Sequence, residues 1–135
     1  MKKIIKIKPR TKALIIGMLL LNTFFIVLGF YKGLGSKTVY IVIFMTLLEF
    51  LDAIYISNHI VFYNDKIKIK NMITKKIKTF QYESISKIKF DTNKSVSFIK
   101  IKFKNGKSIK IHSNCGYGNM QEAEEKFWDA FPHLS

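Results

Sequence analysis

The chain has 135 residues, and its 23 lysine and arginine residues outnumber its 9 acidic residues, which gives a formal net charge of +14 at pH 7. A chain of this length has room for one small domain beside its apolar segments, which excludes a large enzyme fold. Its single cysteine, Cys115, excludes an internal disulfide and a metal site made of several cysteines.

Residues 1–12 form a basic N-terminal segment without an acidic residue. The two segments that follow, residues 13–31 and 38–56, are apolar, and each is 19 residues long. A helix of that length measures about 28 Å, close to the ~30 Å hydrocarbon core of a bilayer. We therefore predict a transmembrane helical hairpin. A signal peptide is disfavoured, because it would have a shorter apolar run and a cleavage site of small residues.

The distribution of positive charge predicts how this hairpin is oriented. Lysine and arginine residues near the ends of membrane spans remain on the cytoplasmic side. Six basic residues precede the first span, whereas the loop between the spans has only Lys32 and Lys37. We therefore expect both termini on the cytoplasmic side of the membrane and a soluble domain formed by residues 57–135.

Three polar residues of the hairpin, Asn22, Glu49 and Asp52, are candidate functional residues. Glu49 and Asp52 are three residues apart, so they share one face of a helix. An ionised carboxylate in hydrocarbon is expensive, and such residues are commonly functional. A structural role is the alternative, in which these acids reach the interface or pair with Lys12 or Arg10. The functional role would be proton-linked or would consist of contact with a peptide.

Antiparallel packing of the two spans places Asn22 near Thr46 and Gly17 at the level of Asp52. A hydrogen bond between Asn22 and Thr46, and close backbone approach at Gly17, would stabilise the pair of helices. Two helices alone make no pore, so a channel or transporter would require an oligomer. The sequence leaves the oligomeric state open.

Beyond the hairpin, apolar and polar residues alternate, which is typical of half-buried β-strands. Asn105 and Gly106 are the strongest signal for a hairpin turn, because both residues tolerate a positive φ. A further turn is expected at residues 91–94. The predicted strands are residues 60–63, 66–70, 76–81, 85–91, 95–104 and 107–112.

A C-terminal helix is predicted to begin at Asn119 and to end at Pro132. Asn119 can cap this helix, and Glu122 is placed to bond back to the cap. Trp128 lies beside the apolar face of the helix. That face consists of Met120, Ala123, Phe127 and Phe131.

The order of these elements resembles the pleckstrin-homology-like (PH-like) superfold, and most closely the bacterial PH-like domains that follow one or two membrane spans. Three segments and the closing helix carry the resemblance: residues 62–69 (FYNDKIKI), 80–88 (FQYESISKI) and 99–107 (IKIKFKNGK). Tyr82 stands at a position where many members of that family have tryptophan. The resemblance implies an α+β membrane protein, in which a two-helix transmembrane hairpin precedes a small antiparallel β-sandwich or open barrel closed by the C-terminal helix.

Lysines on the outward faces of the strands form a candidate binding surface. They would attract anionic lipid headgroups or a membrane protein partner. Alternatively, they are an ordinary solvated face, and the excess of lysine over the single arginine reflects the codons of an AT-rich genome. Nucleic acid is not expected, because aromatic residues for base stacking are not interleaved with the lysines. The candidates are Lys66, Lys68, Lys70, Lys100, Lys102 and Lys104, and Lys76, Lys78, Lys87 and Lys89 are expected to point outward as well.

No catalytic residue, cofactor or metal site is predicted. His59, His112 and His133 are scattered without the spacing of metal ligands, and Cys115 has no obvious base beside it. We expect a non-enzymatic binding or scaffold module tethered to the membrane. One alternative is self-protection, since small basic two-span proteins, some with PH-like domains, resemble bacteriocin immunity proteins, which would intercept a cationic bacteriocin peptide. The second alternative is an accessory subunit of a membrane transport or export complex.

Overall fold

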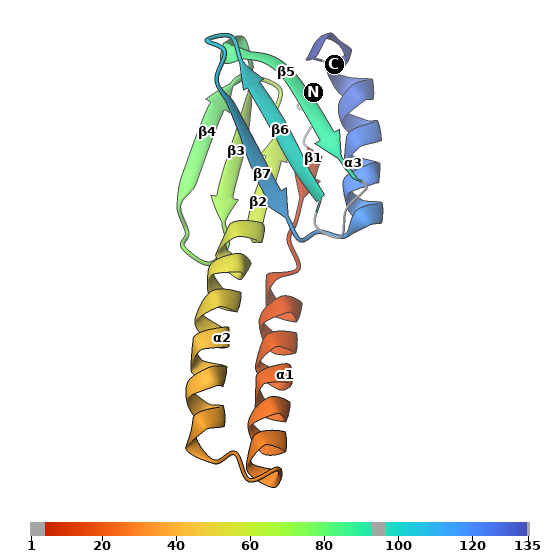
Figure 1. Cartoon of the computed structure of the whole chain (residues 1–135). Coiled ribbons are helices and arrows are strands. Elements are labelled where there is room, and N and C mark those ends of the chain that lie inside the picture. The colour runs from red at the N-terminus through yellow and green to blue at the C-terminus, as the bar shows by residue number, and fades with distance from the viewer. Residues whose placement is uncertain (1–4, 93–96, 135) are drawn as a thin grey trace.

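The structure, a computed structural model, describes residues 5–92 and 97–134. A hairpin of two long helices, α1 (Thr11–Tyr31) and α2 (Ser36–Ile56), carries a sandwich of two β-sheets with a third helix at its side (Figure 1). Both apolar segments are therefore helical, and each helix begins two residues earlier than the sequence indicates. By length and composition, both helices are long and apolar enough to cross a membrane.

The predicted strands are present in the described residues, with ends that shift by at most two residues. Part of the turn expected at residues 91–94, and the first residues of the strand expected from residue 95, lie outside the described residues. Neighbouring strands of both sheets are antiparallel. The first sheet has the order β1 (Ile5–Ile7), β2 (Asn58–Phe62), β3 (Lys66–Asn71), β4 (Ile77–Gln81), and the second has the order β5 (Ile85–Asp91), β6 (Ser97–Phe103), β7 (Ser108–Ser113).

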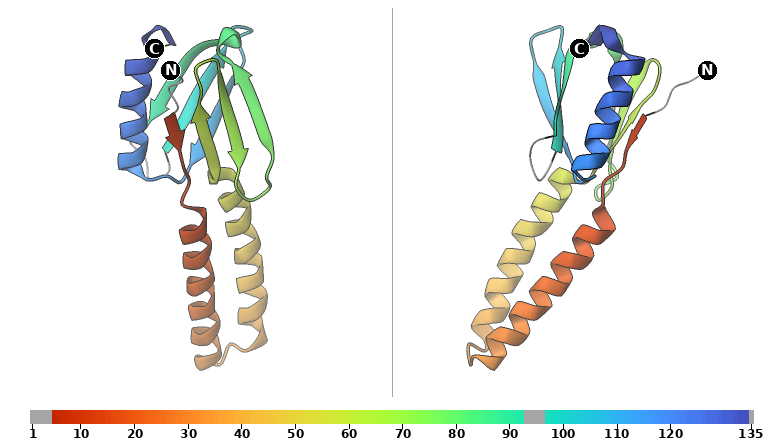
Figure 2. Two further views of the ribbon diagram at one scale, coloured as in Figure 1. Left: turned by 180° about the vertical axis from the view of Figure 1, so that it is seen from behind. Right: turned by 90° about the vertical axis from the view of Figure 1, so that its right-hand side faces the viewer.

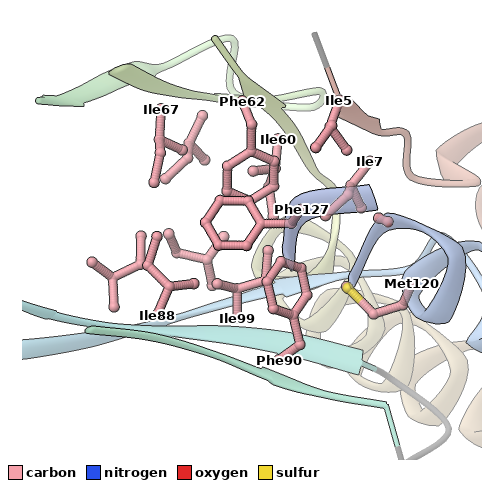
Figure 3. Packing of buried hydrophobic residues seen from close by; sticks show 14 of the residues in the cluster. Ile5, Ile7, Ile60, Phe62, Ile67, Ile88, Phe90, Ile99, Met120 and Phe127 are labelled. Atoms are coloured by element: carbon pink, nitrogen blue, oxygen red, sulfur yellow. The ribbon is translucent and has the colours of Figure 1, made fainter. Parts of the chain in front are cut away.

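Alternate side chains of the strands point between the sheets, where they meet one face of α3 (Tyr117–Ala130). The Phe127 ring lies at the centre of this core, and its centroid is 4.9 Å from that of Phe62 and 5.3 Å from that of Phe90 (Figure 3). α3 lies beside β1 and β5, on the opposite side of the sandwich from β4 (Figure 2). The predicted apolar face of this helix is confirmed, since its four residues are buried: Met120, Ala123, Phe127 and Phe131.

The predicted start of α3 at Asn119 is wrong, because the helix begins at Tyr117. Gly116 precedes the helix with a φ of 93°, a conformation that favours glycine and lets the chain enter the helix two residues early. The Asn119 side chain lies in the first turn, where its Nδ2 donates a hydrogen bond to the Cys115 carbonyl oxygen (2.7 Å). Asn119 therefore ties the helix to the preceding loop and does not cap it.

The sequence does not predict β1, which lies in the basic N-terminal segment. Ile5 and Ile7 pair with Phe62 and Ile60 of β2. Both isoleucines are buried in the core, whereas Lys6 between them is exposed. The N-terminal segment is thus an edge strand of the first sheet, although the whole hairpin separates it from β2 in the sequence.

Hydrogen bonds from the sandwich cap the end of α2. The last carbonyl groups of a helix have no partner within the helix itself. Asn71 Nδ2 donates to the carbonyl oxygen of Ile54, at 2.6 Å. Asn58 Nδ2 donates to the carbonyl oxygen of Tyr55, at 3.0 Å. These two asparagines therefore fix the direction of α2 relative to the strands.

The loop between β7 and α3 contacts the end of α2 and the start of α1. The backbone N–H of Asn114 donates to the carbonyl oxygen of Ile56 (2.8 Å), and the backbone N–H of Arg10 donates to that of Asn114 (2.7 Å). The Arg10 guanidinium lies against Gly116, where a Cβ atom would be 2.8 Å from Arg10 Nη2. One loop therefore contacts both helices where they enter the sandwich.

Candidate functional site

The outer face of the second sheet carries lysines that stand directly opposite one another. Lys87 pairs with Lys102, Lys89 pairs with Lys100, and Lys100 also pairs with Lys110. Four of them line a shallow hollow of about 210 Å³, and Lys110 adjoins Lys100 across the sheet. Within the described residues, none of the five forms an ion pair. We call these five residues the lysine face; like charges placed directly opposite each other destabilise a sheet.

The six lysines predicted as a binding surface do not lie together. Lys66, Lys68 and Lys70 are half-buried on the outer face of the first sheet. Lys100 and Lys102 belong to the lysine face, on the outside of the second sheet. The sixth candidate is exposed just beyond the end of β6: Lys104. The sandwich therefore divides the predicted surface into two, and among the described residues only the second sheet has opposed lysines.

The predicted outward face is wrong for Lys78, although its side chain stays exposed at the edge strand β4. Lys76 precedes β4 and is exposed as well. Lys78 pairs with Ile69, whose side chain is buried between the sheets, and cross-strand partners share a face. Ile77 and Phe80 are three residues apart, so a regular strand cannot turn both of them inward. The structure turns Phe80 inward together with Lys78, and it leaves Ile77 54% exposed on the outside. The order of residues in this strand therefore contained a signal for an inward-facing lysine.

A cleft of about 500 Å³ lies at this point, between the edge strands β4 and β7 and next to the last turn of α2. It is on the side of the sandwich that α3 leaves uncovered (Figure 1). We call it the junction cleft. Its lining residues are Ile54, Tyr55, Asn58, Ile69, Asn71, Thr74, Lys76, Lys78, Ile109, Lys110 and Ile111.

The hairpin contains a cluster of polar side chains around Asn22, which is only 5% exposed. Asn22 Nδ2 donates to Thr46 Oγ1 at 2.8 Å and to Glu49 Oε2 at 3.3 Å. The predicted contact between Asn22 and Thr46 is therefore confirmed. The suggested pairing of the acids with Lys12 or Arg10 is not found, since no ion pair joins them in the described part of the chain. Glu49 instead accepts its hydrogen bond from Asn22.

A second hollow, of about 550 Å³, lies in the groove between α1 and α2 and is lined by Glu49, Asp52 and Gly17 among others. Gly17 is therefore near Asp52, as predicted, but a Cβ atom on Gly17 would meet nothing within 4 Å. A close approach occurs instead at Gly29, where a Cβ atom would overlap the side chain of Thr38. The small residue that permits close packing is thus Gly29.

The remaining reactive side chains do not form a site. Cys115 is fully buried, and burial raises the pKa of its thiol. Burial also lowers the pKa of His59, with the nearby lysines adding to the effect, and burial lowers the pKa of His112. Within residues 5–92 and 97–134, no group of three histidine, cysteine or acidic side chains is close enough to hold a metal ion.

Comparisons of the sequence with protein-family models and with curated proteins found no match, and no solved structure matches the chain. Function must therefore be inferred from the geometry and charge of the lysine face, the junction cleft and the hairpin.

Proposed function

We propose that this chain is a non-enzymatic binding module of the bacterial cell membrane. Its hairpin spans the bilayer twice, and its PH-like sandwich stands in the cytoplasm, where the lysine face binds an acidic surface of a neighbouring membrane protein. The observation that carries the proposal is the row of directly opposed lysines without an ion-pair partner on a sandwich that is joined firmly to an apolar hairpin.

The exposed apolar side chains of the hairpin support membrane insertion. Among the described residues, every strongly exposed large apolar side chain except Ile77 belongs to α1, α2 or the loop between them. The core helix of a soluble protein would bury these side chains, and soluble proteins rarely expose apolar patches of this extent. A bilayer covers such a surface without any protein partner.

The opposed lysines support binding of an anionic ligand. Each directly opposed pair of lysines lowers the stability of the sheet. An acidic side chain in place of one lysine would remove this repulsion without changing the fold. Binding of negative charge at the lysine face would relieve the repulsion among the three pairs.

The direction of the strands favours a protein partner over the surface of the same bilayer. The strands run roughly along the hairpin axis, away from the ends of the helices, so the faces of the sheets stand beside that axis (Figures 1 and 2). The hydrogen bonds of Asn58 and Asn71 to α2 hold the sandwich in this direction. The lysine face is therefore presented sideways, toward molecules next to the hairpin.

Replacing Lys100 and Lys102 together by glutamine removes all three opposed pairs with two substitutions. We expect the full chain, held in phosphatidylcholine nanodiscs at low salt, to bind fluorescent polyglutamate about tenfold more weakly, as for the loss of two exposed charge contacts. We also expect the free energy of unfolding to rise by about 1 kcal/mol, because the repulsion is gone. The fluorescence of the single tryptophan, Trp128, follows the unfolding.

The matched control replaces Lys66 and Lys68 by glutamine, which removes the same charge from the first sheet, where the cross-strand partners of both lysines are uncharged. This variant should keep its stability and most of its affinity for polyglutamate. If both double variants bind equally well, or if the Lys100/Lys102 variant is less stable than the parent, the lysine face is an ordinary solvated surface.

Cysteine labelling tests the proposed orientation. Native Cys115 is buried and should resist a membrane-impermeant maleimide until the chain is denatured, so it is first replaced by alanine. In this background Ser36→Cys places a thiol at the first residue of α2, next to the hairpin loop, and Lys107→Cys places one in the sandwich, both at exposed positions. In intact bacterial cells that produce the chain, we expect Ser36→Cys to be labelled and Lys107→Cys to be labelled only after permeabilisation. The reverse pattern would invert the orientation.

Bacteriocin immunity is a second candidate, favoured by the hollow in the hairpin. Glu49 and Asp52 line this hollow together, which offers two carboxylates to a cationic peptide in the membrane. Protection of a sensitive strain against cationic bacteriocins, lost in a Glu49→Gln/Asp52→Asn variant and kept in the Lys100/Lys102 variant, would favour this function over binding at the lysine face.

A further inference from the structure

The junction cleft points to a ligand of a different kind. We propose that it binds the headgroup of one anionic phospholipid from the leaflet around the hairpin, with the phosphate between Lys76 and Lys78. This inference rests on the membrane insertion proposed above, but it does not depend on the lysine face.

The first step is the position of the two lysines. Both line the cleft, and Lys78 is on the inner face of the first sheet beside the buried Ile69. Both side chains are exposed at the open edge of the cleft, and two cations that line one cleft attract an anion to it. Among the described residues, no aspartate or glutamate lines the cleft and could serve as that anion. An anionic ligand is therefore the partner that the cleft lacks.

The third lysine of the lining points elsewhere. Lys110 Nζ lies 5.1 Å from the centroid of the Phe98 ring, and Phe98 pairs with His112 on the outer side of the second sheet. The Lys110 ammonium group is therefore directed away from the cleft, and its contribution to the lining comes from the rest of the residue. The phosphate is accordingly assigned to Lys76 and Lys78 alone.

The second step is the apolar part of the cleft. Its walls include Ile69, Ile109 and Ile111, and its membrane end is formed by Ile54 and Tyr55 of α2. Tyrosine is enriched at the level of lipid headgroups, where one end of the side chain is wet and the other apolar. A lipid whose phosphate is in the cleft can therefore pass its glycerol and acyl chains along α2 into the bilayer. A soluble anion would make no use of these surfaces.

The third step is that the cleft is preformed and of suitable size. Asn58 and Asn71 are part of its lining, and their side chains are held by hydrogen bonds to α2 and, at 3.3 Å, to each other. Asn58 Nδ2 also donates to the carbonyl oxygen of His112 in β7, at 2.8 Å, which joins the two walls. A volume of about 500 Å³ is within the range of small-molecule sites and is sufficient for a phosphoglycerol headgroup.

The test uses the full chain purified in detergent and native mass spectrometry with phosphatidylglycerol and phosphatidylcholine. We expect the parent protein to retain one phosphatidylglycerol molecule and to bind phosphatidylcholine much more weakly. A Lys76→Gln/Lys78→Gln variant should bind phosphatidylglycerol roughly 30-fold more weakly, from about a fivefold loss for each charge. A Lys76→Arg/Lys78→Arg variant should retain binding, which excludes misfolding as the cause.

The matched control is the Lys66→Gln/Lys68→Gln variant, which removes the same charge from the outer face of the same sheet and should bind phosphatidylglycerol like the parent. Equal binding of both lipids, or no loss in the Lys76/Lys78 variant, would overturn the proposal. If glycerol phosphate displaces the lipid at a similar concentration, the acyl chains contribute nothing to the affinity. The ligand would then be a soluble phosphate, and the assignment to a lipid would be wrong.

The outcomes for the junction cleft and the lysine face are distinguishable. The Lys100→Gln/Lys102→Gln variant should lose polyglutamate binding and keep its phosphatidylglycerol, whereas the Lys76→Gln/Lys78→Gln variant should do the opposite. Loss of both ligands in either variant would mean that total charge, and not a defined site, governs binding, and it would overturn both assignments.

Discussion

Replacement of Phe127 by alanine is expected to unfold the sandwich while the helical hairpin stays formed. Phe127 is fully buried, and its ring centroid lies within about 5 Å of those of Phe62, Phe90, Trp128 and Phe131. Truncation of a buried phenylalanine to alanine costs about 3–5 kcal/mol. Small domains have free energies of unfolding of about 5–15 kcal/mol, so this single substitution removes much or all of the stability of the sandwich.

The effect is not confined to one layer of the sandwich, because Phe127 connects both sheets. Phe62 belongs to the first sheet and Phe90 to the second, and the rings of both face Phe127 (Figure 3). The cavity left by alanine would separate the layers, and the two sheets cannot close it without moving α3. We therefore expect a loss of cooperative unfolding rather than a modest decrease in the unfolding temperature.

Maleimide labelling of Cys115 measures this outcome directly, since the thiol is fully buried in the folded chain. In detergent, the Phe127→Ala protein should be labelled without denaturant, whereas the parent should not. Lys126→Ala is the matched control in the preceding position of α3, because it removes only an exposed ion pair with Glu122 (2.9 Å) and leaves the core intact. Equal protection of Cys115 in both variants would show that the core does not depend on Phe127.

The regular alternation of the strands made most of the sandwich predictable. The bounds of Ile85–Asp91 were predicted without error, because Ile88 and Phe90 alternate with lysines. Ile85 lies three residues before Ile88 and reaches the same buried face through an irregularity of the strand between Ile85 and Lys87. The helices of the hairpin were equally clear, since their apolar character continues over more than five turns. The alternation of apolar residues in a strand and the length of an apolar segment are local properties, so both can be read from a single sequence.

The turn at Asn105 and Gly106 shows where a local signal was insufficient. A two-residue turn there would place Lys100 opposite Ile111, with a charged residue and a core residue on one face. The structure forms a three-residue loop instead, in which the Phe103 N–H donates to the Lys107 carbonyl oxygen (2.8 Å). The need to bury one face of the sheet decided the register, and that register creates the opposed pair of Lys100 and Lys110.

The junction cleft could not be predicted from local pattern at all. One wall comes from β3, β4 and the loop between them, the other wall comes from β7, and the end next to the hairpin comes from α2, so the cleft exists only after the sheets have packed. The one signal in the sequence was the conflict between Ile77 and Phe80, which cannot face the same way along a regular strand. Such a conflict indicates that a polar residue turns inward, but it does not indicate which molecule meets it.

The second large effect is expected at β1, where replacement of Ile7 by aspartate should detach the N-terminal strand from the first sheet. Ile7 is 1% exposed and pairs with Ile60, and β1 packs against α3. An unpaired carboxylate in this position would be desolvated without a partner, which costs several kcal/mol even after relaxation. The structural change with the lowest free-energy cost is detachment of the short strand β1, which exposes the edge of β2.

Hydrogen exchange of the β2 amides measures this detachment, and Lys6→Asp is its matched control, because it places the same charge one residue away on the exposed side of β1. Exchange at Ile60 and Phe62 should be faster in the Ile7→Asp protein alone. The hydrogen bonds of Asn58 and Asn71 to α2 do not involve β1, so the junction cleft should persist and still bind phosphatidylglycerol. Simultaneous loss of the lipid would instead mean that β1, and not the caps on α2, holds the cleft in place over the hairpin.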